Sequence, residues 1–349
     1  GGVAATAGRG WPRGALSGVK RAKLWHRARG GESLRGGRRT SGARLMRFDT
    51  SPAPHVIGGY TVNRVMMQVL LALLPVAVVQ VALYGPRVLL QLATCGLVAL
   101  ACEAAALRLR GRAGRRLPAD GRVLVTAALL ALSVPPLLPW WLAALGTAIA
   151  VLLGKHAYGG LGCNPFNPAM VGYAVLLVSF PLEMTRWAAP AFGQGWDAVT
   201  GATALDQLRT GLGQRLTMQE IFVQPAFGAL GDAGAQWVNA AALLGGLYLL
   251  ARRLVRWHIP VAVLAGMTLP AALMHAFDPG AHAPATFHLF SGATMLCAFF
   301  IATDPVSAAT SDRGRLWYGA GIGALAWIIR AWGGYPDGVA FAVLLMNLA

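Results

Sequence analysis

Long apolar runs recur along this chain, and they constrain its fold more than any other feature. A helix of roughly 20 mostly apolar residues spans the hydrocarbon core of a bilayer. Hydrophobic residues make up 56% of the chain and charged residues only 12%, whereas soluble domains carry about 25% charged residues. So little charge leaves a soluble fold without enough polar surface. We therefore predict an all-α, polytopic membrane protein.

Ten apolar segments are predicted as membrane-spanning helices. They cover approximately residues 65–84, 88–107, 122–138, 140–154, 169–181, 234–251, 259–277, 287–302, 314–330 and 337–349. Proline and glycine interrupt several of them, so some spans are expected to be short or broken. The last segment reaches the end of the sequence, and we expect a few further residues beyond it.

The positions of Lys and Arg in the loops predict the orientation of the chain. Arginines concentrate at 108–122 and 252–258, and the 303–313 loop ends at Arg313 with Arg315 just beyond, whereas the alternate loops 135–139 and 276–286 contain no Lys or Arg. Arginine-rich loops face the cytoplasm. We therefore expect a multi-pass protein of the bacterial inner membrane, with both termini cytoplasmic and the long loop at 182–233 periplasmic.

The formal net charge of +17 is concentrated at the N-terminus. Residues 1–45 contain eleven Lys and Arg but a single acidic residue, Glu32. The segment lacks hydrophobic periodicity and an apolar core suitable for a secretory signal. We interpret it as a basic disordered extension upstream of Met46, where a misassigned start codon is one explanation. A basic arm that binds nucleic acid is the alternative, and we expect no nucleic-acid partner.

The four cysteines show neither paired spacing nor the pattern of a metal site, and we assign no metal ligand. The long loop divides the remaining chain into a first membrane half, 46–181, the loop itself, 182–233, and a second half, 234–349. Each half contains an apolar stretch broken by Gly, Pro or Asn, at 159–170 and 291–308. Matched interruptions of this kind favour two inverted five-helix repeats.

The loop contains a short segment that offers a hydroxyl for modification. Gly201 and Ala202 are small and leave the hydroxyl of Thr203 accessible, and the nearby Thr200 and Asp197 add polar groups. A threonine hydroxyl can form a phosphoester when another enzyme presents an activated phosphate. The simpler interpretation is a helix cap, because Thr203 followed by Asp206 is a common helix start.

Two long blocks of the membrane region carry a family resemblance. The block GGLGCNPFNPAMVGYAVLLVSFP at 159–181 and the block from FHLFSGATMLC to FAVLLMN at 287–347 closely resemble RnfD, a membrane component of the Rnf-type ion-translocating electron-transport complex. They are more distantly similar to NqrB, a membrane component of the sodium-pumping NADH:quinone reductase. The resemblance covers roughly 46–349.

The resemblance implies a covalently bound flavin. In that family an FMN is attached through its phosphate to a threonine in a D-x-x-[ST]-x-A-T loop. Asp197, Thr200, Ala202 and Thr203 match this pattern, and Gly201 lies within it. Thr203 is then the residue that carries the FMN phosphoester, and the other four are expected to contribute to flavin binding. A second, non-covalently bound flavin is an open expectation.

The resemblance also implies a place in a redox-driven ion translocase, in which the chain is not catalytic alone. Such a complex links the redox chemistry of ferredoxin and NAD to the pumping of sodium ions or protons. The partners implied are the FMN-bearing RnfG, further membrane and iron–sulfur subunits, membrane lipid, and a flavin transferase for maturation. The alternatives are an NqrB-like component of the quinone reductase, or an inverted-repeat channel or transporter without redox function.

Several residues outside the loop have both a structural and a functional interpretation. A second Gly-Ala-Thr string, within Ser291–Thr294, is expected to serve close helix packing at the start of an apolar helix, and lining a flavin or ion path is the alternative. Asp304 and Asp337 are candidates for either turn residues or functional acids. Asn164 and Asn167 could orient broken backbone or coordinate a cation, and Glu103 could pair with an Arg of a neighbour or reach the membrane interface. The histidines are assigned no role beyond interface positions.

Overall fold

The structure is a computed structural model, and it describes residues 61–111, 121–160, 162–191, 200–335 and 337–349. The described residues are mostly helical and belong to one compact unit. The predicted all-α class is thereby confirmed. The basic extension 1–45 and Asp197 lie outside the described residues.

The first membrane half contains five long or medium helices. They are α1 (Val62–Tyr84), α2 (Arg87–Leu109), α3 (Gly121–Ser133), α4 (Trp140–Val151) and α5 (Pro168–Ser179). Helix α4 continues as a π-helical turn, η1 (Leu152–His156). The predicted helix at 122–138 ends early, at Ser133, because two prolines follow in sequence, Pro135 and Pro136.

The second half is also helical and contains one broken element. It consists of α9 (Ala235–Ala251), α10 (His258–Phe277), α11 (Ala285–Phe290), α12 (Thr294–Leu296), a second π-helical turn η2 (Cys297–Ile301), α13 (Asp312–Trp332) and α14 (Val339–Leu348). The continuous helix expected at 287–302 was therefore wrong. The chain turns at Ser291–Ala293, where Gly292 takes a left-handed backbone conformation (φ 59°) that favours glycine.

Three of the described helices are long and apolar enough to cross a membrane, judged by length and composition: α1, α2 and α10. Five shorter apolar helices accompany them, namely α3, α4 with η1, α5, α9 and α14. Helices of this composition are consistent with the predicted membrane protein. The count of ten spans stays a prediction.

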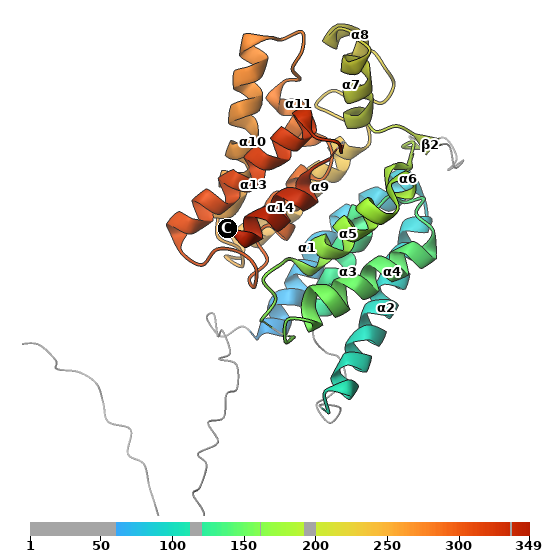
Figure 1. Ribbon diagram of the computed structural model, residues 1–349, viewed down its shortest axis with the longest axis vertical. Helices are drawn as coiled ribbons and strands as arrows, with labels where there is room; N and C mark the ends of the chain where they lie inside the picture. The colour runs from blue at the N-terminus through green and yellow to red at the C-terminus, as the bar shows by residue number, and fades with distance from the viewer. Residues whose placement is uncertain (1–60, 112–120, 161, 192–199, 336) are drawn as a thin grey trace, which may run out of the picture. The chain divides into compact units, whose positions relative to one another are not determined.

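Two helices of the first half pack on two helices of the second half (Figure 1). Helix α1 packs on α9, and α5 packs on α14. A Cβ added at Gly245 of α9 would lie only 2.1 Å from the carbonyl oxygen of Ala72 in α1, so glycine is required for this close approach. Such pairing is what two related repeats predict, and one buried apolar core extends through both halves.

The loop at 182–233 contains short structured elements that the hydropathy pattern did not predict. These are α6 (Pro181–Thr185), the two-residue strands β1 (Trp187–Ala188) and β2 (Thr200–Gly201), α7 (Ala204–Gly213) and α8 (Met218–Phe222). The strands pair antiparallel, with Trp187 opposite Gly201. Helices α7 and α8 share a small apolar core with Phe287 of α11, which fixes the loop on the second half.

Candidate functional site

Thr203 is the N-cap residue of α7. Its backbone is extended (φ −62°, ψ 156°), and its hydroxyl accepts a hydrogen bond from the backbone N–H of Asp206 at 3.3 Å. The helix-cap interpretation of this threonine is therefore confirmed. The cap does not exclude a modification, since the side chain of Thr203 also lines a cavity.

The residues that precede Thr203 are the strand β2 and the linking residue Ala202. Thr200 and Ala202 are exposed, and Gly201 lies in the strand opposite Trp187. Gly201, Ala202 and Thr203 line the cavity, whereas Thr200 is not among its lining residues. Three of the five residues expected from the sequence are thus brought together at one site.

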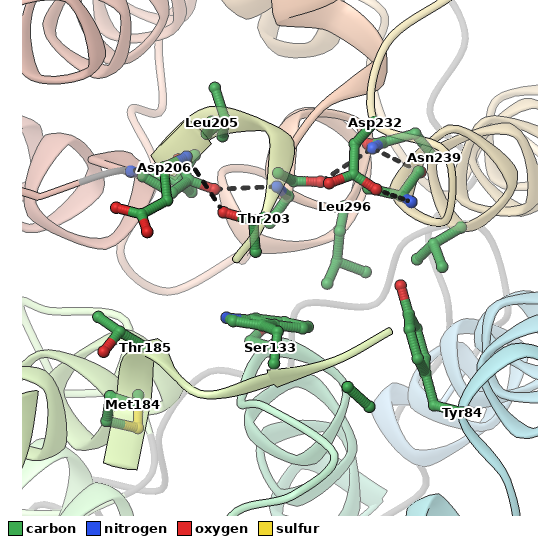
Figure 2. Close-up of a pocket in the computed structure, with 18 of the residues that line it drawn as sticks. Tyr84, Ser133, Met184, Thr185, Thr203, Leu205, Asp206, Asp232, Asn239 and Leu296 are labelled. Carbon is green, nitrogen blue, oxygen red and sulfur yellow. Dashed lines mark hydrogen bonds between the residues drawn. The ribbon is translucent and has the colours of Figure 1, made fainter. Parts of the chain in front are cut away.

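The cavity has a volume of about 490 Å³ and lies between the loop and both membrane halves. Small-molecule sites commonly occupy about 300–1,000 Å³ and are lined mainly by apolar side chains with a few polar groups. Here the lining is largely apolar. Its polar members include Gln80, Tyr84, Ser133, Asp206, Asp232 and Asn239 (Figure 2). The cavity has the size and lining of a cofactor site.

Asp232 joins the loop to the second membrane half. Its Oδ2 accepts a hydrogen bond from the N–H of Ala204 at 3.0 Å, and its Oδ1 accepts from Gly234 at 2.9 Å and Ala235 at 2.8 Å. Its own N–H donates to Oγ of Ser291 at 3.0 Å. One carboxylate thereby caps the starts of α7 and α9 and holds the residue after Thr203 in place.

The second Gly-Ala-Thr string, within Ser291–Thr294, forms another wall of the same cavity. Gly292 and Ala293 line it, while Ser291 and Thr294 are fully buried. The side chain of Asn239 donates to the carbonyl of Gly292 at 2.8 Å and accepts from the N–H of Met295 at 2.9 Å. The string lies in a turn rather than at the start of a continuous helix, so the alternative of a cavity-lining role is the one its position supports.

An ion pair between Arg330 and Asp337 stabilises the turn at Ser291–Ala293. Asp337 accepts from the N–H of Ala293 at 3.0 Å and forms an ion pair with Arg330 at 3.0 Å. The Arg330 guanidinium also donates to the carbonyls of His288 at 2.8 Å and Ser291 at 3.2 Å. Sequence reasoning missed Arg330, because its partners are not its neighbours in the chain.

The remaining sequence candidates have mainly structural contacts. Asn167 caps α5 and donates across the halves to the carbonyl of Ile301 at 3.1 Å. Asn164 donates to the carbonyl of Phe166 at 2.9 Å. Asp304 accepts from Ser307, which is the contact of a turn residue.

Glu103 is buried and pairs with Lys155 at 3.0 Å and with His156 at 2.7 Å. The expectation of an Arg partner for Glu103 was wrong, because its basic partners are Lys155 and His156. The assignment of all histidines to interface positions was wrong for His156 and His288, because both are buried.

The charged side chains that line the cavity are all acidic. Three carboxylates line the cavity (Asp206, Asp232, Asp337), and no Lys or Arg occurs among its described lining residues. No group of three His, Cys, Asp or Glu suited to a metal ion occurs within the described ranges. The cavity is otherwise largely apolar, and the Thr203 hydroxyl lies in its wall at the N-terminus of α7.

Comparison with known proteins gives close relatives over most of the chain. The D subunit of an ion-translocating oxidoreductase complex from Pseudomonas aeruginosa (strain UCBPP-PA14) is 55% identical over 313 residues, which covers 85% of this chain and 90% of that protein. Proteins of the same description from Vibrio cholerae (strain O395) and Aeromonas hydrophila are both 47% identical, over 332 and 330 residues. They cover 87% and 86% of this chain, and 95% and 94% of their own lengths.

The sequence pattern of a protein family also matches residues 49–349, which include both membrane halves and the loop that carries Thr203. The resemblance inferred from the two membrane blocks is thereby confirmed. The chain belongs to the NQR2, RnfD, RnfE family.

Proposed function

We propose that this chain is the RnfD-type membrane component of an ion-translocating oxidoreductase complex and carries an FMN joined covalently through its phosphate to Thr203. The relatives described above are named as the D subunit of such a complex. The observation that carries the flavin assignment is the position of Thr203 at the rim of a cavity of about 490 Å³.

The position of Thr203 suits a phosphoester. A phosphate on its Oγ would lie at the first turn of α7, a helix of ten residues. Backbone N–H groups and the helix dipole favour an anion there. The carboxylates of Asp206 and Asp232 oppose additional negative charge, so the cavity favours a singly charged phosphodiester over a free phosphate monoester.

The other residues would hold and surround the ring system. The aromatic ring of Tyr84, at the end of α1, and the apolar side chains of Leu205 and Leu296 line the cavity (Figure 2). Asp232 positions the start of α7, and Asn239 and Asp337 fix the opposite wall. A bound FMN supplies electron transfer in one-electron steps with proton uptake. The side chains of the protein would position the ring system and determine the polarity of its surroundings.

The complex would link redox reactions of ferredoxin and NAD to the translocation of sodium ions or protons. Its other members would be the FMN-bearing RnfG and further membrane and iron–sulfur subunits, and a flavin transferase would attach the FMN. The arginine distribution supports a location in the inner membrane with the Thr203 loop on the periplasmic side. A second, non-covalent flavin elsewhere in the chain stays part of this proposal.

Intact-mass measurement of the protein purified from cells that contain the transferase tests the proposal. We expect an added mass equal to FMN minus one water, and peptide fragmentation should place it on Thr203. Thr203→Ala should abolish the addition, whereas Thr203→Ser should retain it. Thr294→Ala is the matched control, because Thr294, like Thr203, follows a Gly-Ala pair. A bare wild-type polypeptide, or flavin on Thr294, contradicts the proposal.

A further inference from the structure

Helices α10 and α13 begin side by side at the same end of the second membrane half. A Cβ added at Gly319 would lie 2.8 Å from the carbonyl oxygen of Ile259, and one added at Gly323 would lie 2.1 Å from that of Val263. Because both contacts advance by one turn in the same direction, the two helices run parallel. Their first residues, together with the loop that leads into α10, therefore lie at one end of the helix pair.

This end, formed by residues 252–257 and 311–317 and here called the basic surface, carries a strong positive charge. Two arginines follow α9, one precedes α10 and two lie at the start of α13: Arg252, Arg253, Arg256, Arg313 and Arg315. Within the two stretches the only acidic residue is Asp312, so five positive charges against one negative charge leave a net charge of +4. Oδ1 of Asp312 accepts from Arg256 at 2.8 Å and from Arg315 at 2.6 Å, which ties the loop to α13.

Three arginines of the basic surface have no counter-charge among the described residues. Arg252, Arg253 and Arg313 are exposed, and their side chains form no hydrogen bond or ion pair with another residue that the structure describes. Arg253 is three positions from Arg256, so at most about 11 Å of extended chain separates their Cα atoms. Guanidinium groups gathered in this way suit phosphate oxygens, which they can bind with two parallel hydrogen bonds.

Exposed apolar side chains adjoin the basic surface. Each of its two stretches ends in an exposed tryptophan, Trp257 and Trp317, and the ring of Trp257 stacks on His258 with the centroids 4.1 Å apart. Tryptophan beside arginine is typical of the membrane–water interface. Further exposed apolar residues follow along α10, namely Val261, Leu269 and Leu273. A ligand that matches both features has an anionic headgroup and long apolar chains.

We propose that the basic surface binds an anionic phospholipid with two phosphate groups, cardiolipin. The phosphates pair with the guanidinium groups of Arg252, Arg253 and Arg313, and the acyl chains lie along the exposed apolar side chains of α10. Basic surfaces between membrane helices bind headgroups of this kind. One phosphate would balance only a quarter of the net charge of +4, which favours a lipid with two. A soluble acidic protein would match the charges but would not cover the apolar side chains that follow them.

The backbone at Arg253 allows a test in which lipid binding and stability change in opposite directions. Helix α9 ends with the N–H of Arg253 bonded to the carbonyl of Leu250 at 2.9 Å and that of Leu254 bonded to Leu249 at 3.0 Å. In this helix ending Arg253 takes a φ of 56°, where glycine is the usual residue. Arg253→Gly therefore removes a guanidinium group and relieves the backbone. Helix α7 ends in the same way at Arg215, whose φ is 62°, and this provides a matched control.

Thermal unfolding of the full chain in lipid nanodiscs measures both effects. We expect the Tm of the wild type to rise by several degrees when cardiolipin replaces part of the phosphatidylcholine, and to rise less with phosphatidylglycerol at the same number of phosphates. In pure phosphatidylcholine Arg253→Gly should have a higher Tm than the wild type, yet it should lose most of the cardiolipin response. Arg215→Gly should show a similar gain in Tm and keep the full response.

Native mass spectrometry of the detergent-solubilised chain measures the bound lipid directly. We expect a cardiolipin adduct in the wild type and in Arg215→Gly, and a several-fold weaker adduct when Arg252→Gln, Arg253→Gly and Arg313→Gln are combined. Equal cardiolipin responses of Arg253→Gly and Arg215→Gly, or an equal shift with phosphatidylglycerol, overturn the proposal. Unchanged cardiolipin binding in the combined variant, with poorer recovery of an assembled complex, assigns the basic surface to a protein partner instead. None of these measurements depends on a flavin at Thr203.

Discussion

Oδ2 of Asp232 accepts a hydrogen bond from the N–H of Ala204 at 3.0 Å, although the two residues are 28 positions apart. This bond fixes the start of α7, and hence Thr203, relative to α9. Asp232→Ala removes the acceptor for Ala204, Gly234 and Ala235 at once. We expect the free energy of unfolding to fall by about 2 kcal/mol, because several backbone donors lose a charged partner.

Chemical unfolding of the detergent-solubilised protein measures this loss. Asp232→Asn keeps one side-chain oxygen as an acceptor, so its loss should be clearly smaller. Equal losses in the two variants would show that the carboxylate oxygens do not act as caps.

Asp232 should also lower the reduction potential of a flavin bound to Thr203. A carboxylate that lines the cavity disfavours the addition of an electron to the ring. In Asp232→Asn we expect the midpoint potential to rise by roughly tens of millivolts, since a tenfold change in equilibrium is about 59 mV for one electron. Spectroelectrochemical titration of the flavin-loaded protein measures the shift. Glu220→Gln is the control, because Glu220 is exposed and outside the lining, and an equal shift there would refute a local effect of Asp232.

The contrast between α10 and the segment at 285–301 shows what hydropathy could predict. Helix α10 begins at His258 and ends at Phe277, within one residue of the predicted 259–277, because basic residues precede its apolar run and Asp278, Pro279 and Gly280 follow it. At 285–301 the apolar pattern continues through Ser291–Ala293, but the chain breaks there. Hydropathy does not reveal the side chains of Asn239 and Asp337 that stabilise this turn.

The sequence predicted only part of the candidate site, because it reveals local motifs but not contacts between distant segments. Thr203 could be found because cap and modification motifs are local in sequence. Tyr84, Asp232 and Asn239 come from three separate segments, and only the packing of α1 on α9 and of the loop on both brings them to one cavity. The pairing of Glu103 with Lys155, 52 positions apart, likewise depends on tertiary packing.

Glu220 should make the stability of α8 depend on pH. Its carboxylate accepts from the N–H of Thr217 at 2.7 Å and from the Thr217 hydroxyl at 2.8 Å, which lowers the pKa of Glu220 below its ordinary value. A lowered pKa in the folded state means that this stabilisation is complete above the unfolded pKa, about 4.3, and is lost as the pH falls through the folded value.

Hydrogen exchange at the amide of Ile221 reports the effect, with wild type and Glu220→Gln compared at the same pH. We expect faster exchange in the variant near neutral pH, and equal rates once the wild-type carboxyl is protonated. A difference that persists unchanged to the lowest pH would mean that the capping box does not depend on the charge.

Gly292 is required by its backbone and by its neighbours. Its φ is 59°, and an added Cβ would lie 2.4 Å from Oδ2 of Asp337 and 2.7 Å from Nη2 of Arg330. Gly292→Ala should displace Asp337 from the buried Arg330 and cost about 3–5 kcal/mol, the usual effect of breaking a buried ion pair. Gly162→Ala is the matched control, because Gly162 has φ 80° but no atom within 4 Å of the added Cβ.

The control should lose only about 1–2 kcal/mol, the cost of a left-handed backbone for an L-residue. Unfolding of both variants in the same detergent compares them. Equal losses would show that the contacts of Asp337 and Arg330 add nothing to the backbone effect.

Asn167 combines a helix cap with a link between the two membrane halves. Its Oδ1 accepts from the N–H of Ala169 at 3.0 Å and Met170 at 3.3 Å, while its Nδ2 donates to the carbonyl of Ile301 at the end of η2. Asn167→Asp keeps the cap acceptor but replaces the donor with an oxygen that repels the carbonyl, whereas Asn167→Ala removes both contacts. We expect Asn167→Ala to lower the free energy of unfolding by about 2–3 kcal/mol.

Hydrogen exchange separates the two contacts, because each acts on a different helix. In Asn167→Asp the amides at the start of α5 should keep their wild-type protection, and those of η2 should lose it. In Asn167→Ala both segments should exchange faster. Asn164→Ala is the control, since the side chain of Asn164 donates within its own turn, to the carbonyl of Phe166. If η2 keeps its protection in Asn167→Asp, the bond to Ile301 does not couple the two halves, and the cap on α5 is the main contribution of the Asn167 side chain.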